Sequence, residues 1–193
     1  MTDHLLVDGA VASLADLARA AGVSVPTLRH YFGDRRGAVV AALQQADERS
    51  QALLEELSDP GPHALRASLN QWATRFIDGF RIHGVGALFA GGLTNGLQDP
   101  VIGPAFVDHT LEPSLQLAER LLTRHRERGE LDLEDAEIRG AALALVSPLA
   151  LALLHQDSLS GKQCRPLDVR RFAAEHVGRF LGGYAPSRSV ISD

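Results

Sequence analysis

Gly22 separates two short amphipathic helices that the sequence predicts within residues 13–32. The first helix has small and apolar residues at the spacing of one helix face, namely Leu14, Leu17, Ala18 and Ala21. Ser13, with Asp16 three residues later, forms an acidic variant of the capping box and marks the start of this helix. Glycine readily adopts the left-handed conformation that ends a helix abruptly. The chain must therefore turn sharply here, and the two helices cannot merge into one.

A second helix is predicted immediately after the turn. Ser24 is a suitable N-cap, and Pro26 falls in the first turn, where its missing N–H costs little. Leu28 and Phe32 give this helix a buried stripe. The other side chains face outward or sideways: Val25, Thr27, Arg29, His30 and Tyr31. This order is typical of a helix-turn-helix, whose second helix lies in the DNA major groove, although an Ala-rich pair that simply packs is an alternative.

Residues 17–35 read Leu-Ala-Arg-Ala-Ala-Gly-Val-Ser-Val-Pro-Thr-Leu-Arg-His-Tyr-Phe-Gly-Asp-Arg, and Asp34 is a natural N-cap for a third helix. This stretch resembles the DNA-binding domain of the TetR family of bacterial transcriptional regulators. The signature of that family has the form Ile-Ala-x-x-Ala-Gly-Val-Ser-x-x-Thr-Leu-Tyr-x-His/Tyr-Phe-x-x-Lys. Arg29 stands where the family usually has Tyr, so a guanidinium is expected to remake that phosphate or groove contact.

The resemblance implies which side chains meet DNA. Residues 25–27 would meet base edges at the exposed start of the second helix. Arg35, with the amino end of the following helix, would hold phosphate. The full predicted set is Ser24, Val25, Pro26, Thr27, Arg29, His30, Tyr31 and Arg35.

The amino terminus departs from the family pattern, which places a full helix before the pair. Only twelve residues precede Ser13, and residues 1–9 have room for about two helical turns, with apolar cover from residues 5–7. Either the first helix is shortened, or the chain begins downstream of its natural start.

Composition bounds the rest of the chain. The 193 residues, 45% of them hydrophobic, support one generous domain or a small domain plus a larger one. We expect a DNA-binding domain at 1–45, a helical regulatory and dimerisation domain at 46–183, and a flexible tail at 184–193. A single cysteine and the lack of a secretory signal are consistent with a reducing, cytoplasmic location. The uncharged stretch 140–154 is shorter than a bilayer span and is interpreted as a buried helix.

The distribution of charge permits a nucleic-acid partner despite the net charge of −5. Within residues 1–40, four arginines balance four aspartates, so the remaining chain carries the whole negative excess. Three of those arginines lie in or just after the second helix: Arg29, Arg35 and Arg36. This distribution predicts weak non-specific DNA binding and a need for two half-sites.

The rest of the sequence predicts an all-α protein. Helices are expected from about Val39 to Leu57, Leu65 to Phe80, Gly84 to Gly96, Val107 to Gly129, Glu134 to Leu154 and Leu167 to Leu181. Breaks are predicted at 59–62, at 99–100, at 103–104 and in a loop containing 160–162. The number and order of these helices resemble the TetR regulatory domain.

The last two predicted helices contain more apolar residues than a surface helix with a single buried face requires. The residues concerned are Leu143, Val146, Leu149, Ala150, Leu153, Val169, Phe172, Ala173, Val177 and Phe180. In the TetR family the corresponding helices form a four-helix bundle across a two-fold axis, so a homodimer is predicted. A monomer with a thick core is the alternative.

The central helices contain aromatic residues mixed with glycines and a few polar groups. This mixture resembles the ligand pocket of the family and favours a small apolar or aromatic effector. The candidate lining residues are Trp72, Phe76, Phe80, Phe89, Asn95, Phe106 and His109. A phenylalanine stripe at helical spacing is also compatible with an ordinary core.

Other signals are weak. The glycines of 84–92 follow no strand, as a dinucleotide loop would require, and His109 with Glu112 lacks a third metal ligand. Cys164 lies between Lys162 and Arg165, so a redox-sensing thiol at this position is an alternative interpretation. No catalytic motif stands out, so we expect neither an enzyme nor a cofactor.

The sequence thus predicts a ligand-responsive transcriptional regulator, most simply a repressor. It would bind a palindromic operator as a homodimer and leave it when an apolar effector binds. Two alternatives stay open. One is a helical ligand-binding or protein-binding dimer that has lost DNA binding through its short amino terminus. The other is an all-helical enzyme, which no sequence motif supports.

Overall fold

The computed structural model describes residues 6–7, 10–82 and 84–184, and these are helical apart from one short hairpin. Strands β1 (Leu6–Val7) and β2 (Ala10–Val11) pair antiparallel, with Leu6 opposite Val11. The predicted helical turns are therefore wrong for residues 6–7, whereas 1–5 and 8–9 lie outside the described residues. The sequence between the strands is Asp-Gly, a dipeptide that favours a two-residue hairpin loop.

Helices α1 (Leu14–Ala20) and α2 (Val25–Phe32) form the predicted pair, with the predicted caps. Ser13 accepts a hydrogen bond from the Asp16 backbone N–H at 3.2 Å and completes a capping box. Ser24 accepts from the Thr27 backbone N–H, also at 3.2 Å. Gly22 turns the chain between them with φ +68°. The local sequence signals therefore predict this part of the fold correctly.

The helix pair packs against the start of α3 (Arg35–Ser58). Leu17 and Leu28 are buried together with Ala38 and Val39. Phe32, predicted to be buried, is 37% exposed; it is the last residue of α2 and does not belong to this cluster. Helix α3 runs unbroken across the expected boundary at residues 45–46, so the two expected domains share one helix.

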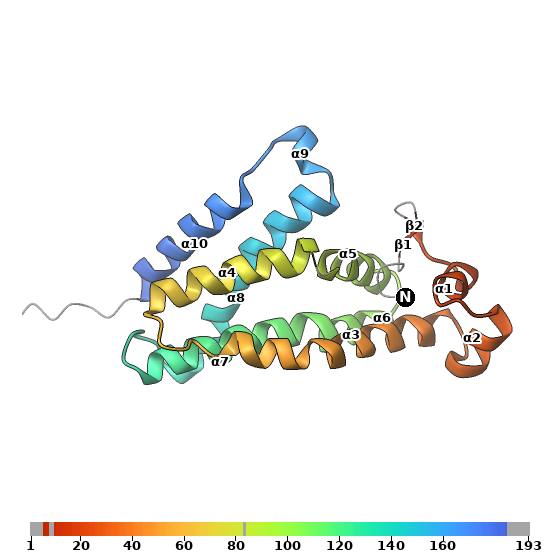
Figure 1. The fold of residues 1–193 in the computed structure, drawn as a ribbon, viewed down its shortest axis with the longest axis horizontal. Coiled ribbons are helices and arrows are strands. Elements are labelled where there is room, and N and C mark those ends of the chain that lie inside the picture. Colours follow the sequence, from red (N-terminus) through yellow and green to blue (C-terminus); the bar gives the residue numbers. More distant parts are fainter. Residues whose placement is uncertain (1–5, 8–9, 83, 185–193) are drawn as a thin grey trace, which may run out of the picture.

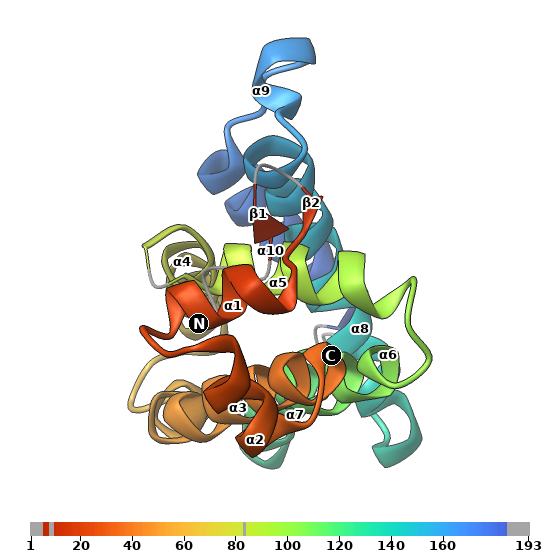
Figure 2. The ribbon, with the colours of Figure 1, turned by 90° about the vertical axis from the view of Figure 1, so that its right-hand side faces the viewer.

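The main core lies at the other end of the molecule (Figure 1). Helices α4 (Leu65–Ile82), α7 (Glu112–Glu127), α8 (Ile138–Leu153) and α10 (Val169–Tyr184) enclose it. A second core joins α1, α2 and α3 to α5 (Val85–Gly96) and α6 (Ile102–Phe106). Phe89 packs against both cores and so connects them. Figure 2 shows α1 and α2 at the near end, with α5 and α6 behind them.

Short irregular helical turns connect the longer helices. The π-helical turn η2 (Val107–Leu111) joins α6 to α7, and a second, η4 (Leu154–Ser158), follows α8. The 3₁₀ turn η3 (Asp135–Glu137) precedes α8, and the short helix α9 (Gly161–Cys164) occupies the loop predicted before α10. The predicted break at residues 103–104 is wrong, because Pro104 falls in the first turn of α6, where it removes no intrahelical hydrogen bond.

Helix α8 is rich in apolar residues. The helical run Asp135–Ser158 is long and apolar enough to cross a bilayer by length and composition, with a mean hydropathy of 1.7. Its side chains Leu145, Leu149 and Leu153 are fully buried in the main core, as predicted from the sequence. Packing within this fold therefore accounts for that face of α8, whereas Leu143 and Leu151 stay exposed on the other.

Candidate nucleic-acid interface and regulatory contacts

Helix α2 presents a polar face to solvent at one extremity of the molecule (Figure 1). The side chains of Arg29, His30 and Tyr31 make no hydrogen bond or ion pair with the described residues, and Tyr31 is 74% exposed. His30 and Tyr31 meet edge to face, with ring centroids 5.2 Å apart. The remaining predicted residues of this helix start are also exposed, apart from half-buried Val25: Ser24, Pro26 and Thr27. The structure thus leaves this face open to a partner.

Arg35 lies apart from this open face. It is half-buried in the first turn of α3, and its Nε donates to the Ala12 carbonyl at 2.7 Å. Its Nη2 donates to Oδ1 of Asn95, near the end of α5. Burial lowers the pKa of the Arg35 guanidinium, although arginine stays charged at any physiological pH. The phosphate contact predicted for Arg35 is therefore replaced, in this conformation, by contacts within the chain.

Asn95 is 1% exposed and uses both ends of its side-chain amide. Its Oδ1 accepts from Arg35, and its Nδ2 donates to the Gly91 carbonyl at 2.6 Å. Asn95 was predicted to line a ligand pocket, but here it joins α5 to α3. The amide geometry suits this bridging role, since it supplies an acceptor and a donor at once.

Arg36 makes a parallel connection. Its Nε lies 2.5 Å from Oδ2 of Asp99, in the turn between α5 and α6. Asp99 Oδ1 accepts from the Val101 backbone N–H at 2.9 Å and so fixes the approach to α6. The hydrogen bond from Arg36 lowers the pKa of Asp99. We call Arg35, Arg36, Asn95 and Asp99 the domain clasp, because they join the start of α3 to the end of α5.

The predicted aromatic lining packs on itself. The ring centroids of Phe80 and Phe89 are 6.0 Å apart, and those of Phe89 and Phe106 are 5.5 Å apart. Phe106 fills the space over Gly92, where an added Cβ would lie 2.3 Å from the ring. Trp72 and Phe76 stack separately at 5.4 Å. In this conformation these rings occupy the space between the central helices, as the core alternative predicts.

His109, the last predicted pocket residue, pairs with another helix. Its Nδ1 lies 3.2 Å from Oδ2 of Asp47 on α3. Glu112, which the sequence places one helical turn from His109, accepts from Arg139 at 2.7 Å. Among the described residues, no group of three His, Cys, Asp or Glu side chains is placed to hold a metal ion.

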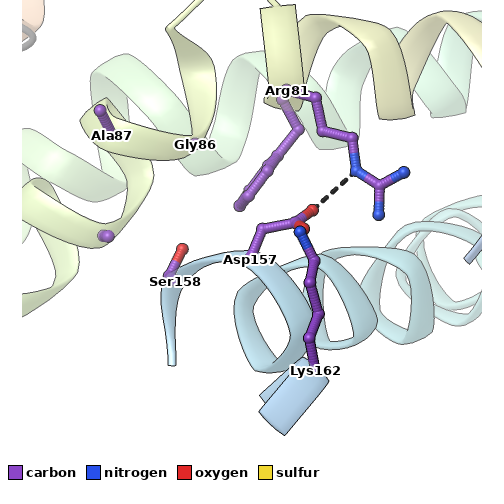
Figure 3. Close-up of a pocket in the computed structure, with 8 residues that line it drawn as sticks. Arg81, Gly86, Ala87, Asp157, Ser158 and Lys162 are labelled. Atoms are coloured by element: carbon purple, nitrogen blue, oxygen red, sulfur yellow. Dashed lines mark hydrogen bonds and ion pairs between the residues drawn. The ribbon is translucent and has the colours of Figure 1, made fainter. Parts of the chain in front are cut away.

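A cavity of about 710 Å³ lies beside the aromatic cluster, between α4, α5 and the turn that contains α9 (Figure 3). Phe80 is the one predicted pocket residue in its wall, together with Gly86, Ala87 and Ala90 of the same region. Arg81 approaches Asp157 from α4, and Lys162 approaches it from α9. No local sequence pattern predicts this trio, because its members come from segments far apart in the chain.

The last two long helices differ from the prediction in how they use their apolar residues. On α10, Val169, Ala173, Val177 and Phe180 are buried in the main core, and Phe172 is half-buried. The exposed face of α8 carries small and apolar side chains at helical spacing: Gly140, Leu143, Ala144, Ser147 and Leu151. We call these five residues the α8 stripe. The described residues leave this apolar face of α8 uncovered.

Comparison with known proteins agrees with this architecture. Residues 57–165 match the family model for the tetracyclin repressor-like C-terminal domain. This match covers more than half of the chain, which therefore belongs to the TetR family of transcriptional regulators, a family of regulators and not of enzymes. No curated protein shows a significant match to the sequence.

Solved structures share the fold at low sequence identity. A putative TetR-family regulator from Mesorhizobium loti MAFF303099 superimposes with a TM-score of 0.73 at 20% identity, covering 91% of this chain and 87% of that one. A TetR regulator from Agrobacterium tumefaciens gives 0.60 at 24% identity, with 95% and 90% covered. SmeT of Stenotrophomonas maltophilia, solved with triclosan, gives 0.64 at 19% identity, with 94% and 85% covered.

Proposed function

We propose that the protein is a ligand-responsive repressor that binds a palindromic operator as a homodimer and leaves it when a small effector binds. The observation that carries this proposal is the open face of α2, where Arg29, His30 and Tyr31 have no partner within the described chain. Arginine and histidine can contact base edges or phosphate, and Thr27 can contact a base or a thymine methyl. The repressor would act in the cytoplasm, where it meets DNA.

Similarity to SmeT supports the direction of regulation. SmeT is described as the repressor of a multidrug efflux pump, and it has been solved with triclosan, a small organic ligand. We infer a comparable arrangement in this chain, with residues 1–45 reading DNA and residues 46–183 responding to the effector.

The α8 stripe supports a homodimer. Leu143 and Leu151 lie two helical turns apart on one face, so a second copy related by a two-fold axis could cover both with the same surface. Such a dimer would place two copies of α2 on one duplex, as a palindromic site requires.

The domain clasp supports coupling between effector and DNA. It joins α3, which follows the reading helix, to α5 of the regulatory domain. An effector that binds one position of α5 better than the other would shift the spacing of the two reading helices.

Band-shift titration with the DNA upstream of the gene tests the function. The Arg29→Ala/Tyr31→Ala variant should bind at least about tenfold more weakly, because it loses a charged and an aromatic contact. Arg66→Ala, which removes an exposed arginine on α4, is the matched control and should bind like the wild type. Unchanged binding by the double variant would refute the site. Absence of DNA binding by the folded wild type would favour a helical dimer without a DNA role.

A further inference from the structure

The cavity between α4, α5 and α9 holds charges that the proposed function does not use. Arg81 Nε donates to Asp157 Oδ2 at 2.7 Å, and Lys162 Nζ lies 2.6 Å from Asp157 Oδ1. Two cations therefore share one carboxylate. The described lining of the cavity keeps one positive charge without a counter-charge (Figure 3).

The cations also keep free hydrogen-bond donors. Arg81 engages Asp157 through Nε alone, and its Nη1 and Nη2 have no partner among the described residues. The Lys162 side chain is 62% exposed, so solvent or a ligand can reach its ammonium group. A guanidinium with open N–H groups suits a carboxylate, which it can bind through two parallel hydrogen bonds.

Part of the cavity lining is apolar, and most of its side chains are small. The ring of Phe80 and the small residues Ala87 and Ala90 form it. Gly86 lets α5 approach α4 closely, since an added Cβ would lie 2.7 Å from the Phe80 carbonyl oxygen. A volume of about 710 Å³ is within the range of pockets that bind small organic molecules.

The turn that supplies Asp157 and Lys162 is strained. Ser160 has φ +57°, in the left-handed region that residues other than glycine rarely adopt. Asp157 and Ser158 belong to the π-helical turn η4, and Gly161 packs so tightly that a Cβ would lie 2.4 Å from the His155 carbonyl oxygen. Such strain and π-helical turns concentrate at functional sites.

We propose that this cavity binds an amphiphilic organic anion, an aromatic ring that bears one carboxylate. The carboxylate binds Arg81 and Lys162, and the ring lies against Phe80, Ala87 and Ala90. One added negative charge neutralises the cluster, whereas a neutral ring leaves its excess charge in place.

This ligand is the effector if the proposed function holds, and its effect on DNA rests on that function. Ala87 and Ala90 lie on the same 12-residue helix as Asn95 of the domain clasp. A ligand that pushes on the start of α5 therefore acts on the helix that holds Arg35. Helices α5 and α3 connect the site to α2, the proposed reading helix.

Calorimetric titration of the full-length protein with 2-naphthoate and with 2-naphthamide tests the site. The two probes have nearly the same shape and differ in charge. We expect naphthoate to bind at least about tenfold more tightly than the amide. Its affinity should fall as the salt concentration is raised. Equal affinity for the two probes, or binding of neither to the folded protein, would overturn the proposal.

Three variants locate the binding. Arg81→Gln/Lys162→Gln should lower the affinity for naphthoate about tenfold or more and leave that for the amide unchanged. Asp157→Asn removes the competing carboxylate, so it should bind naphthoate more tightly. If the trio were only a structural ion-pair cluster, Asp157→Asn would not gain affinity. Arg170→Gln, which breaks an exposed ion pair with Asp78 outside the cavity, is the matched control and should bind like the wild type.

These titrations contain no DNA, so their failure is distinct from failure of the proposed function. If naphthoate binds but leaves the band shift unchanged, the site stands and its regulatory role does not. If the protein binds DNA but no probe, the function stands and the anion site does not.

Discussion

The guanidinium of Arg35, in the first turn of α3, donates a hydrogen bond to the side-chain carbonyl of Asn95, in the last turn of α5. The two residues are 60 positions apart in the chain. This contact joins α3, which follows the proposed DNA-reading helix α2, to α5. If effector binding is coupled to DNA binding as proposed, this pair of side chains connects the two parts of the molecule.

Asn95→Ala should weaken this coupling. The substitution leaves the Nη2 of half-buried Arg35 without its acceptor, and such a loss costs about 1–3 kcal/mol of unfolding free energy. Urea denaturation measures that cost, and band shifts with and without effector measure the coupling. Asn70→Ala, a half-buried asparagine on α4, is the control and should change neither. A variant that keeps wild-type stability and a full response to effector would contradict the role of the domain clasp.

Gly37→Ala should displace α2. A Cβ at this position would lie 2.0 Å from the Phe32 carbonyl oxygen, so the turn between α2 and α3 must open. We expect a loss of roughly 1–3 kcal/mol in unfolding free energy together with weaker DNA binding. Gly79→Ala is the same substitution in α4, where an added Cβ meets nothing within 4 Å. It should stabilise the protein by about 0.5–1 kcal/mol, because alanine favours a helix. Thermal melting of both variants compares them, and equal melting temperatures would exclude the close contact.

Acid should release the ion pair between Arg36 and Asp99. The hydrogen bond from Arg36 lowers the pKa of Asp99 below its ordinary value of 3.8. A carboxyl group with a lowered folded-state pKa stabilises the fold above its unfolded pKa, and this contribution is lost as the pH falls through the folded value. Asp99→Asn should therefore be less stable than the wild type at about pH 6, and the difference should shrink towards about pH 2. Unfolding midpoints measured across this range test the prediction. A difference that stays constant with pH would show that Asp99 acts without its charge.

The α8 stripe should control the oligomeric state. Leu143→Glu/Leu151→Glu places charges on the face that a second copy would cover, and each buried leucine contributes about 1.5–3 kcal/mol. The dissociation constant of the dimer should rise at least about hundredfold. Sedimentation velocity measures this shift, with Leu97→Glu as the control, since Leu97 is 80% exposed at the far end of α5. A dimer that survives the double substitution would assign the interface to another surface.

Local sequence signals were sufficient to predict helices α1 and α2, whereas contacts between distant parts of the chain were not visible in them. Ser13, Gly22 and Ser24 act on their immediate neighbours, so their effect on α1 and α2 can be read from the sequence. The cavity trio of Arg81, Asp157 and Lys162 comes from segments that only the packing of α4 against the α8–α10 connection brings together. Asn95 is a polar residue among apolar neighbours, as in a ligand pocket, but in the structure its side chain binds Arg35. No local sequence pattern links these two residues. The hairpin was missed although Asp-Gly is a known turn signal, because the family resemblance favoured a helix there.

Affinity cleavage is the most direct test of the proposal that α2 enters the major groove of duplex DNA. A DNA-cleaving iron chelate is attached to the cysteine of a Thr27→Cys/Cys164→Ser variant, and the operator is mapped for cuts. The wild-type protein labelled at Cys164, its one cysteine, is the control, because this exposed residue lies on α9, away from α2 (Figure 1). We expect the chelate at position 27 to produce two clusters of cuts, separated by roughly 10 base pairs or a multiple of that spacing. The chelate at Cys164 should produce no cuts. Equal cutting from both positions, or no cutting from Thr27 on DNA that the protein binds, would contradict the proposal.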